Sequence, residues 1–438
     1  MTRTTKQWLS VIVYLLIVLS PVIVLLVAPG PEHRQVWREI SVALAFVGLS
    51  LMGLQFVPTA RLPVLANLFP LDAIYRFHHW SSVAALVLVL SHPIILIGFN
   101  PFILRLLNLA TAPGRARAGV IALLAAVLLA VLSIYRKEIK LKYEIWRASH
   151  IAFTLVAAGF ALYHIVGVGH YMGMPAERAL WTVMAAMWVV LTLWVRVLKP
   201  LQLLKRPYEV KEVRGERADS WSLVLEPVGH AGLTFKAGQA AWLNLGGSPF
   251  GIGEHPFSFS SSAEHPERLE FTVRELGDFT SAIGDTPVGT KAYVDGPYGT
   301  FGLHCRDGDG CVFVAGGVGS APIMSILRTM ADRGDERPLI LVYGSRTWDD
   351  VIYREELQPL EQKLNLHVVH VLEEPPSGWS GEVGYITADV LGRHLPDDRR
   401  SLAYLICGPL LMIRLVEKAL RSLGVPRSRI DSEKYEMA

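Results

Sequence analysis

Two stretches of equal length decide the fold: HHWSSVAALVLVLSH at residues 78–92 and HIAFTLVAAGFALYH at residues 150–164. Each begins and ends with histidine at the same spacing, since 92 − 78 = 14 and 164 − 150 = 14. On a helix, fourteen residues rise about 21 Å and turn about 1400°, which is about 40° short of four full turns. Both histidines of a stretch therefore share one helix face near opposite ends of an apolar segment.

The histidine spacing predicts an iron site. A bis-imidazole heme needs one neutral histidine from each side of the porphyrin. Two facing helices of this kind would hold two stacked hemes of the b type, with His78, His92, His150 and His164 as the ligands. Alternatively, the histidines satisfy one another inside a bundle, although ionisable groups in a membrane span tend to mark function. His79, thirteen residues before His92, is a competing ligand.

The composition is that of a membrane protein. Of 438 residues 51% are hydrophobic and 18% are charged, and the net charge of +3 is too small to suggest nucleic-acid binding. Six apolar segments have about the 20 residues that a lipid bilayer requires. They cover residues 8–28, 38–57, 79–99, 118–135, 149–168 and 179–198.

The distribution of basic residues predicts the orientation of these spans. Lysine and arginine concentrate before the first span, in the second and fourth loops and after the sixth span. The positive-inside rule therefore places both termini in the cytoplasm. In that orientation His78 and His150 form an inner pair, and His92 and His164 form an outer pair.

After the sixth span the pattern changes to short strands and turns. Residues 207–305 predict a small antiparallel β-barrel. HPFSFSS at residues 255–261, FTVRELGDFT at 271–280 and DGPYGTFG at 295–302 supply an aromatic ring, small hydroxyls and glycine-rich backbone amides, which suit a flavin ring and a pyrophosphate. The candidate FAD contacts are His255, Pro256, Phe257, Ser258, Ser261, Arg274, Gly277, Asp278, Phe279, Thr280 and Gly296.

Residues 308–438 predict an α/β nucleotide-binding domain. CVFVAGGVGSAPIMSILRTM at residues 311–330 is a strand, a glycine turn and an amphipathic helix, the phosphate-binding corner of a dinucleotide fold. Its candidate contacts are Gly316, Gly317, Gly319 and Pro322. Further strands are expected at residues 339–346 and 402–409. Arg346 follows the first of them, where a guanidinium suits the 2′-phosphate of NADPH; a solvated loop arginine is the alternative.

The three cysteines, Cys305, Cys311 and Cys407, form no CxxC motif, so we expect no zinc site and reduced thiols. No feature of the sequence indicates an oligomeric state.

Nearly the whole chain resembles the ferric reductase and NADPH oxidase superfamily in its bacterial form. His78-His79-Trp80-Ser81-Ser82 is similar to the HRWLG-like stretch that carries the first ligand in the family, which favours His78 over His79. The resemblance implies a six-helix di-heme domain at residues 1–200, followed by a ferredoxin-NADP reductase module. It also implies a bacterial inner-membrane location.

The resemblance assigns further site residues. It implies that the HPFS segment binds the flavin, that LGDFT binds the FAD pyrophosphate, and that the GGVGSAP turn binds the nicotinamide nucleotide. Cys407, Gly408 and Pro409 would lie near the nicotinamide, and the aromatic residue that stacks on the flavin in many relatives would be Tyr435 or would be absent. One departure concerns the acceptor: Leu96 replaces a histidine that lines the oxygen site in oxygen-reducing members.

These features predict a transmembrane oxidoreductase. Electrons from cytosolic NADPH or NADH would pass through FAD and two hemes to an external acceptor, most simply a ferric chelate. An oxygen-reducing, superoxide-producing NADPH oxidase is the alternative, and a heme anchor that passes electrons to a partner protein is the weaker one. The complete flavin and nucleotide segments argue against a passive anchor.

Overall fold

The computed structural model describes residues 3–32, 34–302 and 310–434. The chain forms two compact units, one made of Met1–Leu68 and Ala73–Pro200 and the other of Phe69–Asp72 and Leu201–Ala438. Cys305, Tyr435 and the predicted boundary between residues 305 and 308 lie outside the described residues.

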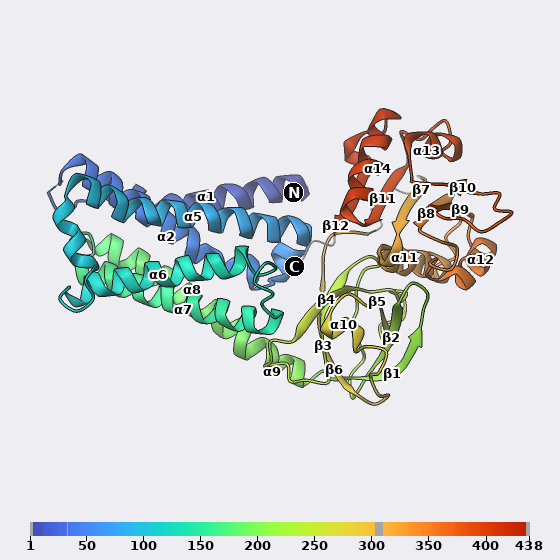
Figure 1. Ribbon diagram of the computed structural model, residues 1–438, viewed down its shortest axis with the longest axis horizontal. Coiled ribbons are helices and arrows are strands. Elements are labelled where there is room, and N and C mark those ends of the chain that lie inside the picture. The colour runs from blue at the N-terminus through green and yellow to red at the C-terminus, as the bar shows by residue number, and fades with distance from the viewer. Residues whose placement is uncertain (1–2, 33, 303–309, 435–438) are drawn as a thin grey trace. The chain divides into compact units, whose positions relative to one another are not determined.

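Long apolar helices make up the first unit (Figure 1). They are α1 (Arg3–Val27), α2 (Val36–Leu54), α5 (Leu71–Phe99), α6 (Gly114–Ile134), α7 (Tyr143–Val168) and α8 (Pro175–Leu193), with α9 (Lys199–Leu204) continuing α8 through a π-turn at Trp194–Leu198. Short helices α3 (Phe56–Thr59) and α4 (Pro63–Ala66) and the 3-10 turn Pro101–Leu107 connect them.

Within the described residues, six helical segments are long and apolar enough to cross a membrane. The prediction of six spans is confirmed, and the chain is an integral membrane protein. Several helices extend beyond the apolar runs: α5 begins at Leu71, whereas the predicted span begins at residue 79. Helical hydrogen bonding continues there through the polar turns that flank the apolar core.

Small residues allow the helices of this unit to approach closely. A Cβ atom on Gly53 of α2 would lie 2.1 Å from the ring of Trp188 in α8. Ala122, Ala125 and Ala126 of α6 are buried. Since lipid supplies no hydrophobic force between helices, such close packing stabilises the bundle.

The barrel lobe, residues 207–302, is an antiparallel sheet of strand order β4-β3-β6-β1-β2-β5. Its elements are β1 (Tyr208–Gly215), β2 (Ser220–Pro227), β3 (Ala240–Leu245), β4 (Glu254–Ser258), β5 (Leu269–Arg274), α10 (Asp278–Ser281) and β6 (Lys291–Tyr298). A bridge between Phe259, which follows β4, and Phe271 of β5 joins the two edges of the sheet. Leu223, Leu243 and Phe271 fill its interior.

The α/β lobe, residues 310–434, is a parallel sheet of order β10-β9-β8-β7-β11-β12. Its strands are β7 (Cys311–Gly316), β8 (Leu339–Ser345), β9 (Leu366–Leu372), β10 (Glu382–Val383), β11 (Ala403–Gly408) and β12 (Ile430–Lys434). Its helices are α11 (Ser320–Asp332), α12 (Arg354–Lys363), α13 (Ala388–His394) and α14 (Leu410–Ser422).

Helices cover both faces of this sheet (Figure 1): α11 and α12 pack on one apolar core, and α13 and α14 on the other. The chain order reverses between β7 and β11, so the carboxyl ends of these two strands form the switch point where such sheets bind nucleotides. The predicted fold class is confirmed.

The expectation that all cysteines are reduced is wrong for Cys311, which is disulfide-bonded. Cys407 is buried and is not part of a disulfide.

Candidate functional site

The four predicted histidine ligands meet in two pairs within the helical unit. The rings of His78 and His150 have centroids 6.3 Å apart, and those of His92 and His164 are 6.5 Å apart. Two imidazole nitrogens that bind one metal ion at about 2 Å each lie about 4 Å apart, which places the ring centroids about 6 Å apart. The observed separations fit one metal ion per pair.

His79 does not join either pair. Its exposed ring packs edge-to-face against Trp80, with centroids 5.2 Å apart. The structure therefore pairs His78, and not its neighbour, with a histidine of α7.

A glutamine holds the ring of His78. Nδ1 of His78 lies 3.0 Å from Oε1 of Gln55, the residue that directly follows α2. The amide group of Gln55 donates to the carbonyl of Leu51 at 3.0 Å and to the hydroxyl of Tyr14 at 3.3 Å, so its oxygen must face the histidine. His78 therefore donates from Nδ1, and its Nε2 is left as an acceptor.

Nδ1 of His150 also acts as a donor, and its acceptor is Ser133 of α6. The hydroxyl of Ser133 donates to the carbonyl of Leu129 at 2.7 Å and accepts from Nε1 of Trp146 at 3.2 Å. Its single proton is thus in use, so the 3.2 Å contact with Nδ1 of His150 must be donated by the histidine. Nε2 of His150 is again the unprotonated nitrogen.

Backbone carbonyls hold the second pair. Nδ1 of His164 lies 2.7 Å from the carbonyl oxygen of Arg115, which can only accept. Nδ1 of His92 lies 3.2 Å from the carbonyl and 2.8 Å from the hydroxyl of Ser41, whose own proton reaches the carbonyl of His92 at 3.0 Å. Gly119 of α6 makes room for His164, because a Cβ atom there would lie 2.8 Å from Nδ1.

All four histidines therefore share one tautomer. Ligating histidines usually donate their second ring N–H to a carbonyl or a polar side chain, which fixes the tautomer and raises the basicity of the bound nitrogen. The residues that provide these acceptors were not predicted. The sequence signal available was Gln55, a polar residue near the end of the second apolar segment.

The predicted flavin segments meet in the barrel lobe. His255 and Phe257 of β4 both stack on Phe279 of α10, at centroid separations of 4.1 and 6.0 Å. Arg274, Gly277 and Asp278 are exposed beside them. The HPFS and LGDFT segments therefore lie together as a flavin site requires.

Other predicted flavin contacts have structural partners. The hydroxyl of Thr280 accepts from the backbone N–H groups of Leu276 and Gly277, and that of Ser261 accepts from the N–H of Glu270 at 3.0 Å. Pro256 and Ser258 belong to β4 and Gly296 to β6, two strands that flank β3.

The glycine turn lies at the switch point of the α/β sheet. Gly317 has a φ of +54°, in the left-handed region that glycine adopts without strain. A Cβ atom on Gly319 would lie 2.5 Å from the carbonyl oxygen of Cys407. Only glycine allows the turn after β7 to approach the end of β11 this closely. Pro322 is buried in the first turn of α11.

The β11 segment presents Cys407, Gly408 and Pro409 at the same point, but the Cys407 side chain is fully buried in the core beneath α11. Its predicted contact with the nicotinamide stays a prediction. Arg346 is exposed and pairs with Glu374 at 3.0 Å.

One further acidic residue lies at this edge. Glu433 of β12 is in register with Cys407, and its Oε2 has no hydrogen-bond partner among the described residues. Burial, with a contribution from Asp431, raises the pKa of Glu433 to about 8. No sequence pattern singled out this residue beyond its place near Tyr435.

Two family models match the chain. Residues 44–161 match "Ferric reductase like transmembrane component", and residues 313–418 match "Oxidoreductase NAD-binding domain". The first match includes all of His78, His92 and His150, and the second includes the glycine turn and Cys407.

Curated relatives match about half of the chain. The reductase component of propane 2-monooxygenase from Rhodococcus jostii is 35% identical over 227 residues, which are 50% of this chain and 60% of that protein. The gamma subunit of sulfhydrogenase 2 from Pyrococcus furiosus is 34% identical over 212 residues, 45% of this chain and 70% of that protein. The chain thus spans less than two thirds of the propane monooxygenase component.

Among solved structures, the chain is similar to a ferredoxin reductase in carbazole 1,9a-dioxygenase. The two are 26% identical, with a TM-score of 0.45, over 52% of this chain and 69% of that one.

Proposed function

The chain belongs to the ferric reductase and NADPH oxidase superfamily, and on this premise we propose that it moves electrons from NAD(P)H across a membrane. It is a membrane oxidoreductase with a ferric reductase-like helical domain and a flavin- and NAD(P)H-binding reductase module. The proposal extends this to two hemes and an external acceptor of the ferric chelate type.

The shared tautomer of the four histidines carries the proposal. Each pair presents two unprotonated Nε2 atoms, and each Nδ1 is fixed by a carbonyl, amide or hydroxyl oxygen. Histidines that only satisfied one another would donate a proton from one ring to the other. Here each Nδ1 contacts an oxygen atom outside its own pair, so both Nε2 atoms of a pair would be available to hold a heme iron.

The residues divide the work as follows. His78 and His150 would hold an inner heme and His92 and His164 an outer one, while Phe279 with His255 and Phe257 would hold the flavin. The turn at Gly317 and Gly319 would hold the nucleotide phosphates through exposed amides. When bound, FAD accepts an electron pair from the nicotinamide and heme iron accepts single electrons.

We further propose that both termini are cytoplasmic and that the chain resides in the inner membrane of a bacterium. The basic loops support this orientation. Since the reductase module follows the last span, it would then face cytosolic NAD(P)H, and the pair formed by His92 and His164 would face the external acceptor.

Heme content tests the ligand assignment. Purified His164→Ala and His92→Ala variants should each contain one heme per chain where the natural protein contains two. His79→Ala is the matched control and should retain both. Two hemes in His164→Ala, or loss of one in His79→Ala, would show that the assignment is wrong.

The acceptor is tested by reoxidation of the reduced protein. Ferric citrate should reoxidise the hemes rapidly and oxygen slowly. Fast reoxidation by oxygen, with a superoxide dismutase-sensitive signal, would contradict the proposed acceptor and make the chain an oxidase.

A further inference from the structure

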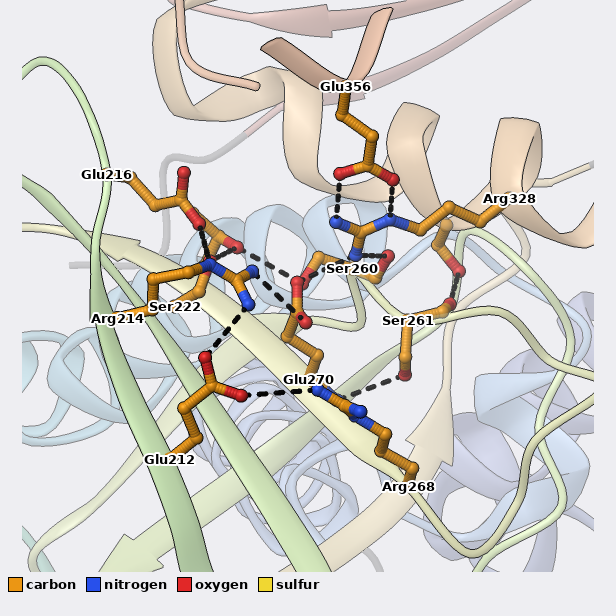
Figure 2. Close-up of polar contacts among 12 residues, drawn as sticks. Glu212, Arg214, Glu216, Ser222, Ser260, Ser261, Arg268, Glu270, Arg328 and Glu356 are labelled. Carbon is orange, nitrogen blue, oxygen red and sulfur yellow. Dashed lines mark hydrogen bonds and ion pairs between the residues drawn. The ribbon is translucent and has the colours of Figure 1, made fainter. Parts of the chain in front are cut away.

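Arg328, on α11 of the α/β lobe, contacts both lobes of the reductase module (Figure 2). Its Nε and Nη2 donate to the two carboxylate oxygens of Glu356 at 2.7 and 2.6 Å. Its Nη1 donates to the carbonyl of Ser260 at 2.8 Å and to Oε1 of Glu270 at 2.7 Å. Glu356 belongs to the same lobe as Arg328, whereas Ser260 and Glu270 belong to the barrel lobe.

The geometry makes this arginine a rigid connection. Glu356 accepts two parallel hydrogen bonds from one edge of the planar guanidinium, and this fixes the orientation of the guanidinium. The remaining Nη1 donors then reach across to the barrel lobe. The ring of Tyr353 lies 5.3 Å from the guanidinium carbon and covers it. The Arg328 side chain is only 15% exposed.

The buried carboxylate of Glu270 in the barrel lobe is neutralised by Arg328 of the α/β lobe and by Arg214. Glu270 is 6% exposed, and its second oxygen lies 3.4 Å from Arg214. Burial raises the pKa of Glu270, but the guanidinium groups of Arg328 and Arg214 outweigh it and hold that pKa below its ordinary value. Glu270 is therefore ionised and needs its cationic partners.

Two neighbours of Arg328 on α11 also form hydrogen bonds with the barrel lobe. Ser325 donates from its hydroxyl to the carbonyl of Ser261 at 2.7 Å, and the hydroxyl of Thr329 accepts from the N–H of Ala263 at 2.9 Å. Residues 325, 328 and 329 share one helix face because they are three and four positions apart. This face binds the chain directly after β4.

These contacts connect two cofactor segments. Ser260 and Ser261 belong to the predicted flavin segment, and α11 begins at Ser320, immediately after the glycine turn. From Ser320 to Arg328 the helix rises about 12 Å. Fixing α11 against residues 260–263 therefore fixes the nucleotide turn relative to the flavin strand.

We propose that Arg328 is a positioning residue that sets the placement of the nicotinamide against the flavin. The inference rests on the proposed function, because it assumes that this module transfers hydride between the two. A displacement of about 1 Å in such a pair costs roughly 100-fold in rate. Arg328 touches neither cofactor; it acts through the helix and the strand that hold them.

The test uses the full-length, FAD-loaded protein in detergent under anaerobic conditions. Arg328→Met keeps the length of the side chain and removes the charge and the donors. Arg333→Met is the matched control, since Arg333 follows α11 and pairs across the lobes with Glu264, but its side chain is 56% exposed. Stopped-flow absorbance with NADPH gives the flavin reduction rate and the nicotinamide–flavin charge-transfer band.

We expect at least a tenfold slower flavin reduction in Arg328→Met at saturating NADPH, with loss of the charge-transfer band and unchanged FAD content. Arg333→Met should remain within twofold of the natural protein. Equal rates and an intact charge-transfer band in Arg328→Met would overturn the inference.

A second variant separates positioning from simple charge imbalance. Arg328→Met leaves the buried carboxylate of Glu270 with Arg214 as its remaining cationic partner. Arg328→Met combined with Glu270→Gln removes this weakly compensated charge together with the guanidinium. Slow reduction should persist in this double variant. A return to the natural rate would show that the defect came from the weakly compensated charge of Glu270 and would overturn the inference.

The natural protein distinguishes this inference from the proposed function. If NADPH and NADH both fail to reduce its flavin, the proposed function fails. If they reduce it, and the Arg328 variants reduce equally fast, only the positioning role fails.

Discussion

Replacement of Gly119 by alanine should remove the outer heme selectively. A Cβ atom at this position of α6 would lie 2.8 Å from Nδ1 and 3.0 Å from Cε1 of His164. Ordinary contact begins at 3.4 Å, so the ring must retreat by about 3.4 − 2.8 = 0.6 Å. The same ring is bound to the carbonyl of Arg115 at 2.7 Å, which opposes the movement.

The expected loss of heme affinity follows from how little a ligand can be displaced in a binding site. Ligands must be held within about 0.5 Å of their working positions, and one added methyl in a packed site costs about 1–3 kcal/mol. If this cost falls on heme binding, affinity for the outer heme decreases about 5- to 150-fold. Alanine is about 1 kcal/mol more favourable than glycine in a helix, so the fold itself should persist.

The assay is the heme-to-protein ratio after purification, combined with low-temperature EPR of the ferric hemes. Gly119→Ala should fall from two hemes toward one. Gly159→Ala on α7 is the matched control, because a Cβ atom there meets nothing within 4 Å. The reasoning would be refuted if Gly119→Ala kept two hemes with unchanged EPR signals.

Three further outcomes are expected. Gln55→Leu removes the acceptor of His78 Nδ1, so the potential of the inner heme should rise by about 20–60 mV in a redox titration, equivalent to one neutral hydrogen bond. Gly319→Ala places a Cβ atom 2.5 Å from backbone, so NADPH-driven flavin reduction should slow more than tenfold. Arg393 holds the pKa of Glu382 at about 2, below the ordinary 4.5, so the pair stabilises above pH 4.5 and its contribution is lost as pH falls toward 2. The thermal midpoint of Glu382→Gln should therefore decrease less over this range than that of the natural protein.

Each of these three predictions has its own control or contradicting result. An unchanged inner potential in Gln55→Leu would show that the hydrogen bond does not act on a ligand. Gly392→Ala on α13 should reduce flavin normally, because its Cβ atom meets only Leu423 at 3.8 Å; normal flavin reduction by Gly319→Ala would contradict the close approach of the turn. Equal pH slopes in the Glu382 variant and the natural protein would show that the pair does not stabilise the fold.

The spans and the pairing of histidines could be predicted because they depend on local helical geometry. A spacing of fourteen residues places His78 and His92 on one face whatever the surroundings. The groups that hold the rings could not be predicted, since Ser41 is 51 residues from His92 and Gln55 is 23 residues from His78. Such contacts depend on how helices pack, which local sequence does not encode.

In the reductase module, too, local features could be predicted from the sequence and contacts between distant residues could not. The glycine turn after β7 was predicted because a strand, a turn and a helix follow one another in the chain. Arg328 was not singled out, since its partners Glu270 and Ser260 are 58 and 68 residues away in the other lobe. Ser261 was predicted as a flavin contact from its motif, and this contact stays a prediction; its hydroxyl accepts a hydrogen bond from the backbone N–H of Glu270.

Anaerobic reduction of the hemes by NADPH tests the central claim most directly. In purified protein supplemented with FAD, NADPH should reduce two low-spin hemes whose ferric EPR signals are those of bis-imidazole ligation. In His92→Ala only one heme should be present and reduced. Hemes that dithionite reduces but NADPH does not, or ferric signals without bis-imidazole ligation, would contradict electron transfer through the two histidine pairs.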